Sequence, residues 1–88
     1  MELSKTDLTT GEELPGARLQ LTDENGAVVE EWTSTKEPHI IKELVVGKSY
    51  TLTENKPADG YATAESITFT VENTAEIQKQ VMEDDVTK

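Results

Sequence analysis

One lysine and two carboxylic acids occupy positions in this chain where the alternation of a β-strand calls for an apolar residue. They follow the apolar residues of three short alternating runs, which are Leu3 then Lys5, Tyr50 and Leu52 then Glu54, and Met82 then Asp84. Residues two apart in a strand point to the same face, so we expect all three ionisable groups to face the core. An unpaired buried charge costs several kcal/mol, so such groups must pair, become neutral or react.

These residue types allow an amide bond to form between Lys5 and Asp84, with Glu54 moving the protons. Burial disfavours charged forms, so it lowers the pKa of an amine and raises the pKa of a carboxyl group. A neutral amine is a nucleophile, and a neighbouring carboxyl group can accept its proton and protonate the departing hydroxyl. Fixed proximity adds an effective molarity of about 10⁵ M or more. The product would be a domain closed by its own side chains, with water as the leaving group.

Two alternatives remain open from the strand phase alone. The three groups could form a buried Lys–Asp or Lys–Glu salt bridge, or lie at strand ends where they reach solvent. The last strand could also adopt the opposite phase, in which Ile77, Val81 and Asp85 face inward and Asp85 replaces Asp84 as the partner of Lys5.

The composition favours a small, acidic domain that an internal amide bond would stabilise. The chain has 88 residues, of which 34% are hydrophobic and 5% aromatic, so its core is thin for a single domain. It contains no cysteine and one histidine, so neither a disulfide nor a metal cluster supplies a staple, and we expect no metal and no cofactor. The net charge of −10 argues against nucleic acid and anionic membranes as partners.

The hydrophobic pattern predicts seven short strands. We expect them over residues 2–7, 17–22, 27–33, 39–43, 49–54, 66–72 and 76–84, with one helical turn as an option over 74–78. Asp23-Glu24-Asn25-Gly26 predicts a hairpin turn, because an Asn-Gly pair tolerates positive φ. One-sided alternation in these strands predicts an all-β, immunoglobulin-like sandwich of two sheets. The short borders of the chain indicate one domain over residues 1–88, cut from a longer protein.

Other candidate sites have weaker patterns. His39 starts a strand and lacks a nucleophile elbow, so we expect a structural or surface histidine. Neither acidic run, at residues 23–25 or 83–85, has the spacing of an EF-hand calcium loop. Leu14-Pro15-Gly16-Ala17 lacks the Thr-Gly of a sortase signal, and we interpret it as a turn. We expect Trp32 in the core and Tyr61 as an anchor of its loop.

Seven segments of the chain resemble the Cna B-type domain of Gram-positive adhesins and pilins, which is also called SpaA-like or prealbumin-like. They are LSKTD (3–7), TGEELPGA (10–17), LTDENG (21–26), GKSYTLTE (47–54), DGY (59–61), ITFTV (67–71) and VMED (81–84). In that family the lysine of the first segment bonds to an Asp or Asn in the last strand. The glutamate after the Tyr-x-Leu-x pattern is the catalyst. The resemblance therefore implies Lys5 and Asp84 as the cross-link and Glu54 as the catalytic proton shuttle.

The resemblance implies a prealbumin-like fold and a structural function. We expect a stalk or spacer domain of an adhesin or pilin that is monomeric, extracellular and anchored to the cell wall within a longer protein. Its partners would be neighbouring domains of the same chain. The bond forms once and without turnover, so we do not expect an enzyme. The alternative is a module that binds a host matrix protein or a glycan through its loops. A third option is one half of an engineered ligation pair, although this chain carries both halves.

Overall fold

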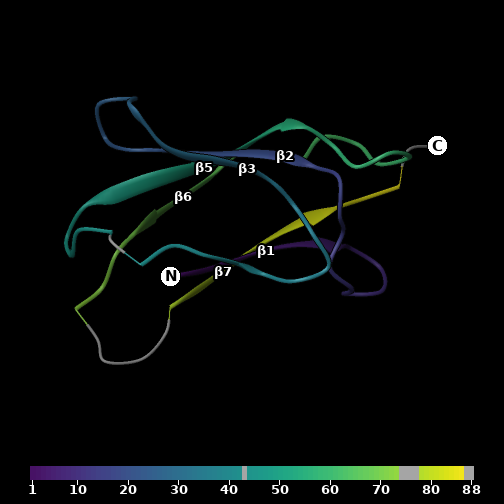
Figure 1. Ribbon diagram of the computed structural model, residues 1–88, viewed down its shortest axis with the longest axis horizontal. Coiled ribbons are helices and arrows are strands. Elements are labelled where there is room, and N and C mark those ends of the chain that lie inside the picture. The colour runs from purple at the N-terminus through teal and green to yellow at the C-terminus, as the bar shows by residue number, and fades with distance from the viewer. Residues whose placement is uncertain (43, 74–77, 87–88) are drawn as a thin grey trace.

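Seven strands form two facing sheets in the computed structural model, which describes residues 1–42, 44–73 and 78–86 (Figure 1). The strands are β1 (Glu2–Asp7), β2 (Arg18–Thr22), β3 (Val28–Thr33), β4 (His39–Ile40), β5 (Ser49–Lys56), β6 (Ile67–Thr70) and β7 (Lys79–Asp84). One sheet has the order β4-β1-β7 and the other has the order β3-β2-β5-β6. The fold is the all-β, seven-stranded sandwich that the sequence predicts.

The first and last strands are neighbours in the smaller sheet. β1 and β7 pair in parallel, with a register that runs from Glu2 opposite Lys79 to Asp7 opposite Asp84. The same register places Lys5 beside Met82. Antiparallel strands can follow one another through a tight hairpin, but parallel neighbours need a long connection, and here most of the chain lies between them. The two ends of the sequence are thereby brought into one layer.

The larger sheet is antiparallel and begins with the predicted hairpin. Asp23 Oδ1 accepts hydrogen bonds from the amides of Asn25 (2.9 Å) and Ala27 (3.0 Å), which closes the turn between β2 and β3. Gly26 has φ = 81°, a conformation that glycine adopts without the steric cost of a Cβ atom. The strong turn signal in the sequence therefore fixes this end of the sheet.

The core lies between the alternating inner faces of the two sheets. Its fully buried side chains include Leu21, Leu52 and Met82, and Tyr50 and Phe69 pack there with ring centroids 6.3 Å apart. In β5 every second residue from Tyr50 to Glu54 is buried, as a strand with one face on a core requires.

Several boundaries differ from the predicted ones. β4 ends at Ile40 instead of residue 43, and residue 43 itself lies outside the described part. β6 is shorter than residues 66–72, and β5 continues to Lys56. β7 starts at Lys79, whereas residues 74–77, which contain most of the optional helical turn, lie outside the described residues. No helix of the described part is long and apolar enough to cross a membrane.

Candidate functional site

The three ionisable residues singled out in the sequence meet inside the sandwich. β1 carries Lys5 on the same face as Leu3, β5 carries Glu54 after Leu52, and β7 carries Asp84 after Met82. The side chain of Lys5 is 1% exposed, and those of Glu54 and Asp84 are 0% exposed. Strands from both sheets thus place one amine and two carboxyl groups in the dry interior. We call these three residues the buried cluster.

The amine of Lys5 contacts both carboxyl groups of the buried cluster. Its Nζ lies 3.2 Å from Glu54 Oε2 and forms its closest contact with Asp84 Oδ1. Among the described residues, the Lys5 amine and the Asp84 carboxyl group have no hydrogen-bond partner apart from these ion-pair contacts. A buried polar group without its full set of hydrogen bonds costs about 1–3 kcal/mol, so the cluster is an expensive feature of a small core.

Burial raises the pKa of the Glu54 carboxyl group above its usual value of 4.5, and the neighbouring Asp84 carboxyl group raises it further. The Ala64 amide, which donates to Glu54 Oε1 at 2.8 Å, and the nearby Lys5 amine act in the opposite direction but are weaker. A carboxyl group with a raised pKa keeps its proton at higher pH and can give it to another group. Glu54 has the environment that general acid–base chemistry needs.

The last strand follows the phase that turns Asp84 inward. Val81 is 50% exposed and Asp85 is also exposed, whereas Met82 and Asp84 are buried. Ile77, the third residue of the rival phase, lies outside the described residues. The register with β1 agrees with this phase. It pairs Asp84 with Asp7, which is also buried, at the ends of the two strands.

A loop that the sequence did not connect to the site contacts β5, β1 and the residue that follows β7. In residues 57–66, the Ala64 amide binds Glu54, and the Ala62 amide donates to the Asp85 carbonyl group at 2.9 Å. The Tyr61 hydroxyl donates to Asp7 Oδ2 at the end of β1. Tyr61 is therefore the loop anchor that its sequence context predicts. Its partner could not be found from local pattern, because 54 positions separate the two residues.

The remaining candidates have structural surroundings. His39 is half-buried, stacks on Trp32 with ring centroids 4.2 Å apart, and hydrogen-bonds to Glu30. Trp32 is half-buried on the edge strand β3 and packs against the core from its border, so its prediction as a core residue is only partly right. Asp23 closes a hairpin. The described residues hold no group of three or more side chains placed to bind a metal ion.

Comparison with known structures finds the same fold in domains of several bacterial proteins. The Bacillus anthracis TIE protein is 26% identical, with a TM-score of 0.77 over 97% of this chain. A shaft pilin, SpaA from Lactobacillus rhamnosus GG, is 17% identical with a TM-score of 0.73 over 99% of this chain. The group B streptococcus pilus 2b backbone protein is 20% identical with a TM-score of 0.75 over 97%. No curated protein sequence matches the chain.

This chain corresponds to only part of each of these solved structures. It covers 16% of the TIE chain, 45% of the shaft pilin chain and 40% of the pilus backbone chain. The shaft pilin and the pilus backbone protein are only 17% and 20% identical to this chain, so their likeness to it shows a shared fold. The family model for the SpaA prealbumin-like fold domain matches residues 1–85, which include every strand and the whole buried cluster. The chain therefore belongs to the SpaA family of prealbumin-like fold domains.

Proposed function

We propose that this domain is a structural stalk or spacer module of a Gram-positive surface protein and that it locks itself with an amide bond between Lys5 and Asp84. The observation that carries the proposal is the contact of one amine and two carboxyl groups in a fully buried site. Membership of the SpaA family and the likeness to a shaft pilin and a pilus backbone protein support the structural function.

The bond forms by condensation inside the core. Lys5 Nζ attacks the carboxyl carbon of Asp84, the C–N bond forms, and one Asp84 oxygen leaves as water. The two hydrogens of that water come from the amine and from the neutral acid. Glu54, whose pKa is raised by burial, takes the proton from the amine and returns one to the departing oxygen. β1 and β7 hold the Lys5 amine and the Asp84 carboxyl group in contact, so the two groups need little further ordering before they react.

The cross-link would carry load through the module. Because β1 and β7 are parallel neighbours, force that enters through β1 reaches Lys5, crosses to Asp84 and leaves beyond β7 without extending the intervening chain. The bond closes a loop of about 80 residues, and the chain-entropy model assigns such a loop roughly 4.5 kcal/mol. Such a domain resists pulling and proteolysis, which suits an extracellular, cell-wall-anchored chain of several domains whose partners are its neighbours.

The mass of the intact folded protein tests the proposal. We expect a mass one water below that of the sequence, with a cross-linked peptide that joins Lys5 to Asp84. Glu54→Ala should fold but keep the full mass, because the proton shuttle is removed. Asp84→Asn should react with loss of ammonia and give the same linked product. An intact mass equal to that of the sequence for the folded wild-type protein would overturn the bond.

A ligand-binding function has less support from the aromatic residues. A binding platform would need exposed rings that cluster at one loop end, but Tyr50 and Phe69 lie in the core. Trp32 stacks on His39, and Tyr61 is tied to Asp7. Binding of a host matrix protein or a glycan is therefore the second candidate function of this domain.

A further inference from the structure

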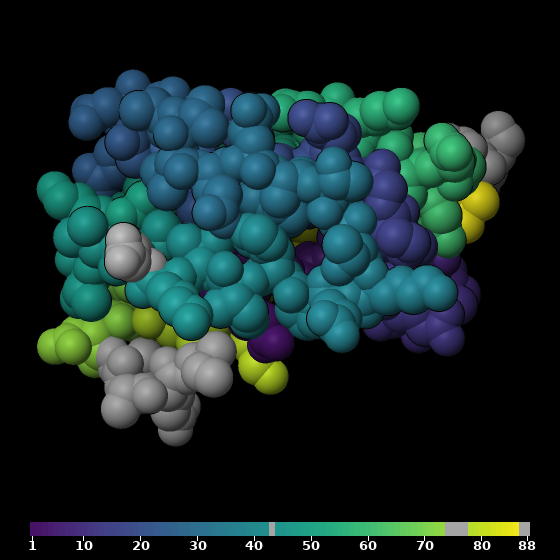
Figure 2. Space-filling view, viewed as in Figure 1, coloured from purple at the N-terminus to yellow at the C-terminus, as the bar shows by residue number. Residues whose placement is uncertain are grey.

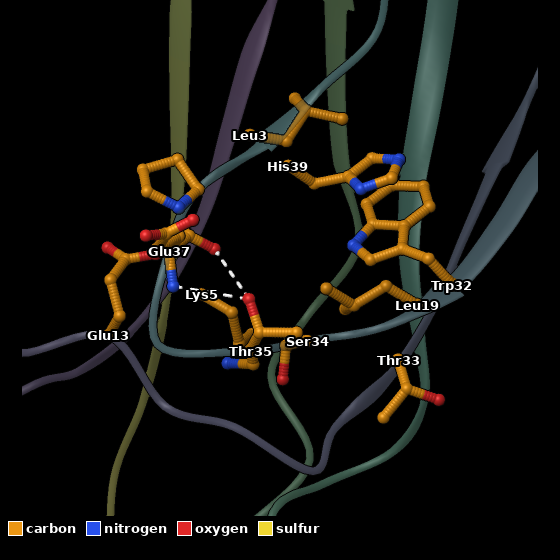
Figure 3. A pocket seen from close by; sticks show the side chains of 11 residues that line it. Leu3, Lys5, Glu13, Leu19, Trp32, Thr33, Ser34, Thr35, Glu37 and His39 are labelled. Carbon is orange, nitrogen blue, oxygen red and sulfur yellow. Dashed lines mark hydrogen bonds between the residues drawn. The ribbon is translucent and has the colours of Figure 1, made fainter.

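A small cavity opens beside the buried cluster. Its volume is about 50 Å³, and the residues around it include Lys5, Glu13, Trp32, Thr35, Glu37 and His39 (Figure 3). A water molecule needs roughly 10–15 Å³ of such volume, so the cavity has room for a few waters. Figure 2 shows an opening in this face, bordered by blue and teal residues, with purple and yellow atoms of the terminal strands at its bottom.

The side chain of Lys5 separates this cavity from the reacting acid. Lys5 lines the cavity, and its amine contacts Asp84 and Glu54. Neither carboxyl residue lines the cavity, and both side chains are 0% exposed. Because the Lys5 side chain lines the cavity and ends against Asp84, we expect that its removal beyond Cβ enlarges the cavity toward the Asp84 carboxyl group.

The walls suit the passage of small polar molecules. Glu13, Thr35 and Glu37 supply polar groups on one side, and the Thr35 hydroxyl is already bonded to the Glu37 backbone (Figure 3). The opposite side is formed by the stacked rings of Trp32 and His39, which are held in place by the bond between His39 and Glu30. A ring stack and a side-chain hydrogen bond therefore order this side of the cavity.

We propose that this cavity is the solvent port of the buried cluster. Water released by condensation leaves through it, and small primary amines can enter it and react with Asp84 when the side chain of Lys5 is absent. This inference rests on the proposed function. In the amine reaction the nitrogen of the amine attacks the Asp84 carboxyl carbon, a C–N bond forms, and one carboxyl oxygen leaves as water with one hydrogen from the amine and one from the acid.

Lys5→Ala with n-propylamine tests the port, because n-propylamine carries the same carbon and nitrogen atoms that the substitution removes. We expect an adduct at Asp84 whose mass exceeds that of the protein by the amine minus one water. We also expect propylamine to raise the melting temperature of Lys5→Ala but not that of the wild-type protein. The bulky 2,2-dimethylpropylamine should do neither, and Lys5→Ala/Asp84→Ala should gain no adduct.

A mouth-filling variant distinguishes the port from general opening of the fold. Thr35 is exposed and lines the cavity, whereas the neighbouring Lys36 is exposed and does not line it. In the Lys5→Ala background, Thr35→Trp should slow the reaction or binding of propylamine at least tenfold, and Lys36→Trp should leave it unchanged. Equal rates in the two variants would overturn the port.

The failure of the port and the failure of the cross-link give different results. If the wild-type protein keeps its full mass, the proposed function fails. If the wild-type protein loses water but folded Lys5→Ala shows neither an adduct nor stabilisation by propylamine, the port fails alone. Should Lys5→Ala not fold, Lys5→Thr with ethylamine is the replacement, because a β-branched residue suits a strand.

Discussion

Asp7 and Asp84 stand opposite each other at the ends of two parallel strands, yet their carboxyl groups have different surroundings. Asp7 Oδ1 accepts hydrogen bonds from the amides of Thr9 (2.7 Å) and Thr10 (3.0 Å), and Oδ2 accepts one from the Tyr61 hydroxyl. Asp84 instead contacts the Lys5 amine beside the carboxyl group of Glu54. Of two buried aspartates in register, one accepts hydrogen bonds from three donors, and the other contacts an amine beside a second carboxyl group.

Because of these different surroundings, the pKa of Asp7 and the pKa of Glu54 in the buried cluster shift in opposite directions. The Tyr61 hydroxyl, followed by the Thr10 and Thr9 amides, lowers the pKa of Asp7 below 3.8, because hydrogen bonds to the ionised form favour it. Burial raises the pKa of Glu54 above 4.5. Burial alone therefore does not decide the direction in which a carboxyl pKa shifts. A carboxylate with a full set of donors is a stable structural element, and a desolvated one beside an amine is suited to proton transfer.

The largest expected effect comes from a change in the buried cluster. Glu54→Gln should fold without forming the bond, and its free energy of unfolding should fall by about 4.5 kcal/mol, the loop-entropy value for a cross-link of this span. Urea denaturation of samples whose intact mass is known measures the difference. Glu31→Gln, a change on the exposed edge strand, is the control. A linked Glu54→Gln protein would contradict the role of Glu54.

A neutral, fully bonded side chain gives a second point of comparison. The Ser34 hydroxyl donates to the Leu14 carbonyl group at 2.6 Å and accepts from the Ala17 amide at 2.9 Å. Ser34→Ala leaves that buried amide without its side-chain partner, and we expect a loss of about 1–3 kcal/mol in the free energy of unfolding. Chemical denaturation provides the value, and intact mass should show that the cross-link still forms. An unchanged stability would show that another group replaces the hydroxyl.

The pH dependence of stability should differ in sign between the two regions. The folded-state pKa of Asp7 is lowered, so its contribution is present above the unfolded value of 3.8 and is lost as the pH falls through the folded value. Thermal unfolding of the wild-type protein and Asp7→Asn should therefore converge in acid and separate above about pH 4. A constant difference across this range would contradict the lowered pKa.

For Glu54 the expected slope is the reverse, and it is measured in unlinked Lys5→Met protein. The folded-state pKa of Glu54 is raised, so its favourable contribution is present below the unfolded value of 4.5 and is lost as the pH rises through the folded value. Lys5→Met should lose stability over that window, and the additional change Glu54→Gln should reduce the loss. An identical pH profile in the two proteins would rule out this contribution.

The smallest expected effect comes from removing the Tyr61 hydroxyl group, which donates a hydrogen bond to Asp7. Tyr61→Phe keeps the ring but removes the strongest cause of the lowered Asp7 pKa. We expect the pKa of Asp7, followed by NMR, to move back toward 3.8, with only a small decrease in melting temperature and normal cross-linking. Failure of the bond to form would show that the loop of residues 57–66 also positions the buried cluster.

Local alternation predicted the core faces well, because a strand with one buried side has a period that the sequence displays directly. It placed Leu52 and Glu54 on one face and, through Met82, turned Asp84 inward. It could not predict that β4 would end at Ile40, because the end of a short edge strand depends on its pairing with β1. The link between Tyr61 and Asp7 was also out of reach, since it depends on the closure of a distant loop.

The parallel register of β1 and β7 has a consequence for mechanics that does not depend on the cross-link. Glu2 lies beside Lys79 and Asp7 beside Asp84, so tension applied before β1 and after β7 slides the two strands along each other. Their interstrand hydrogen bonds then share the load at the same time, instead of opening one after another as in a peeled hairpin. The topology alone thus gives the domain shear strength, with or without a bond between Lys5 and Asp84.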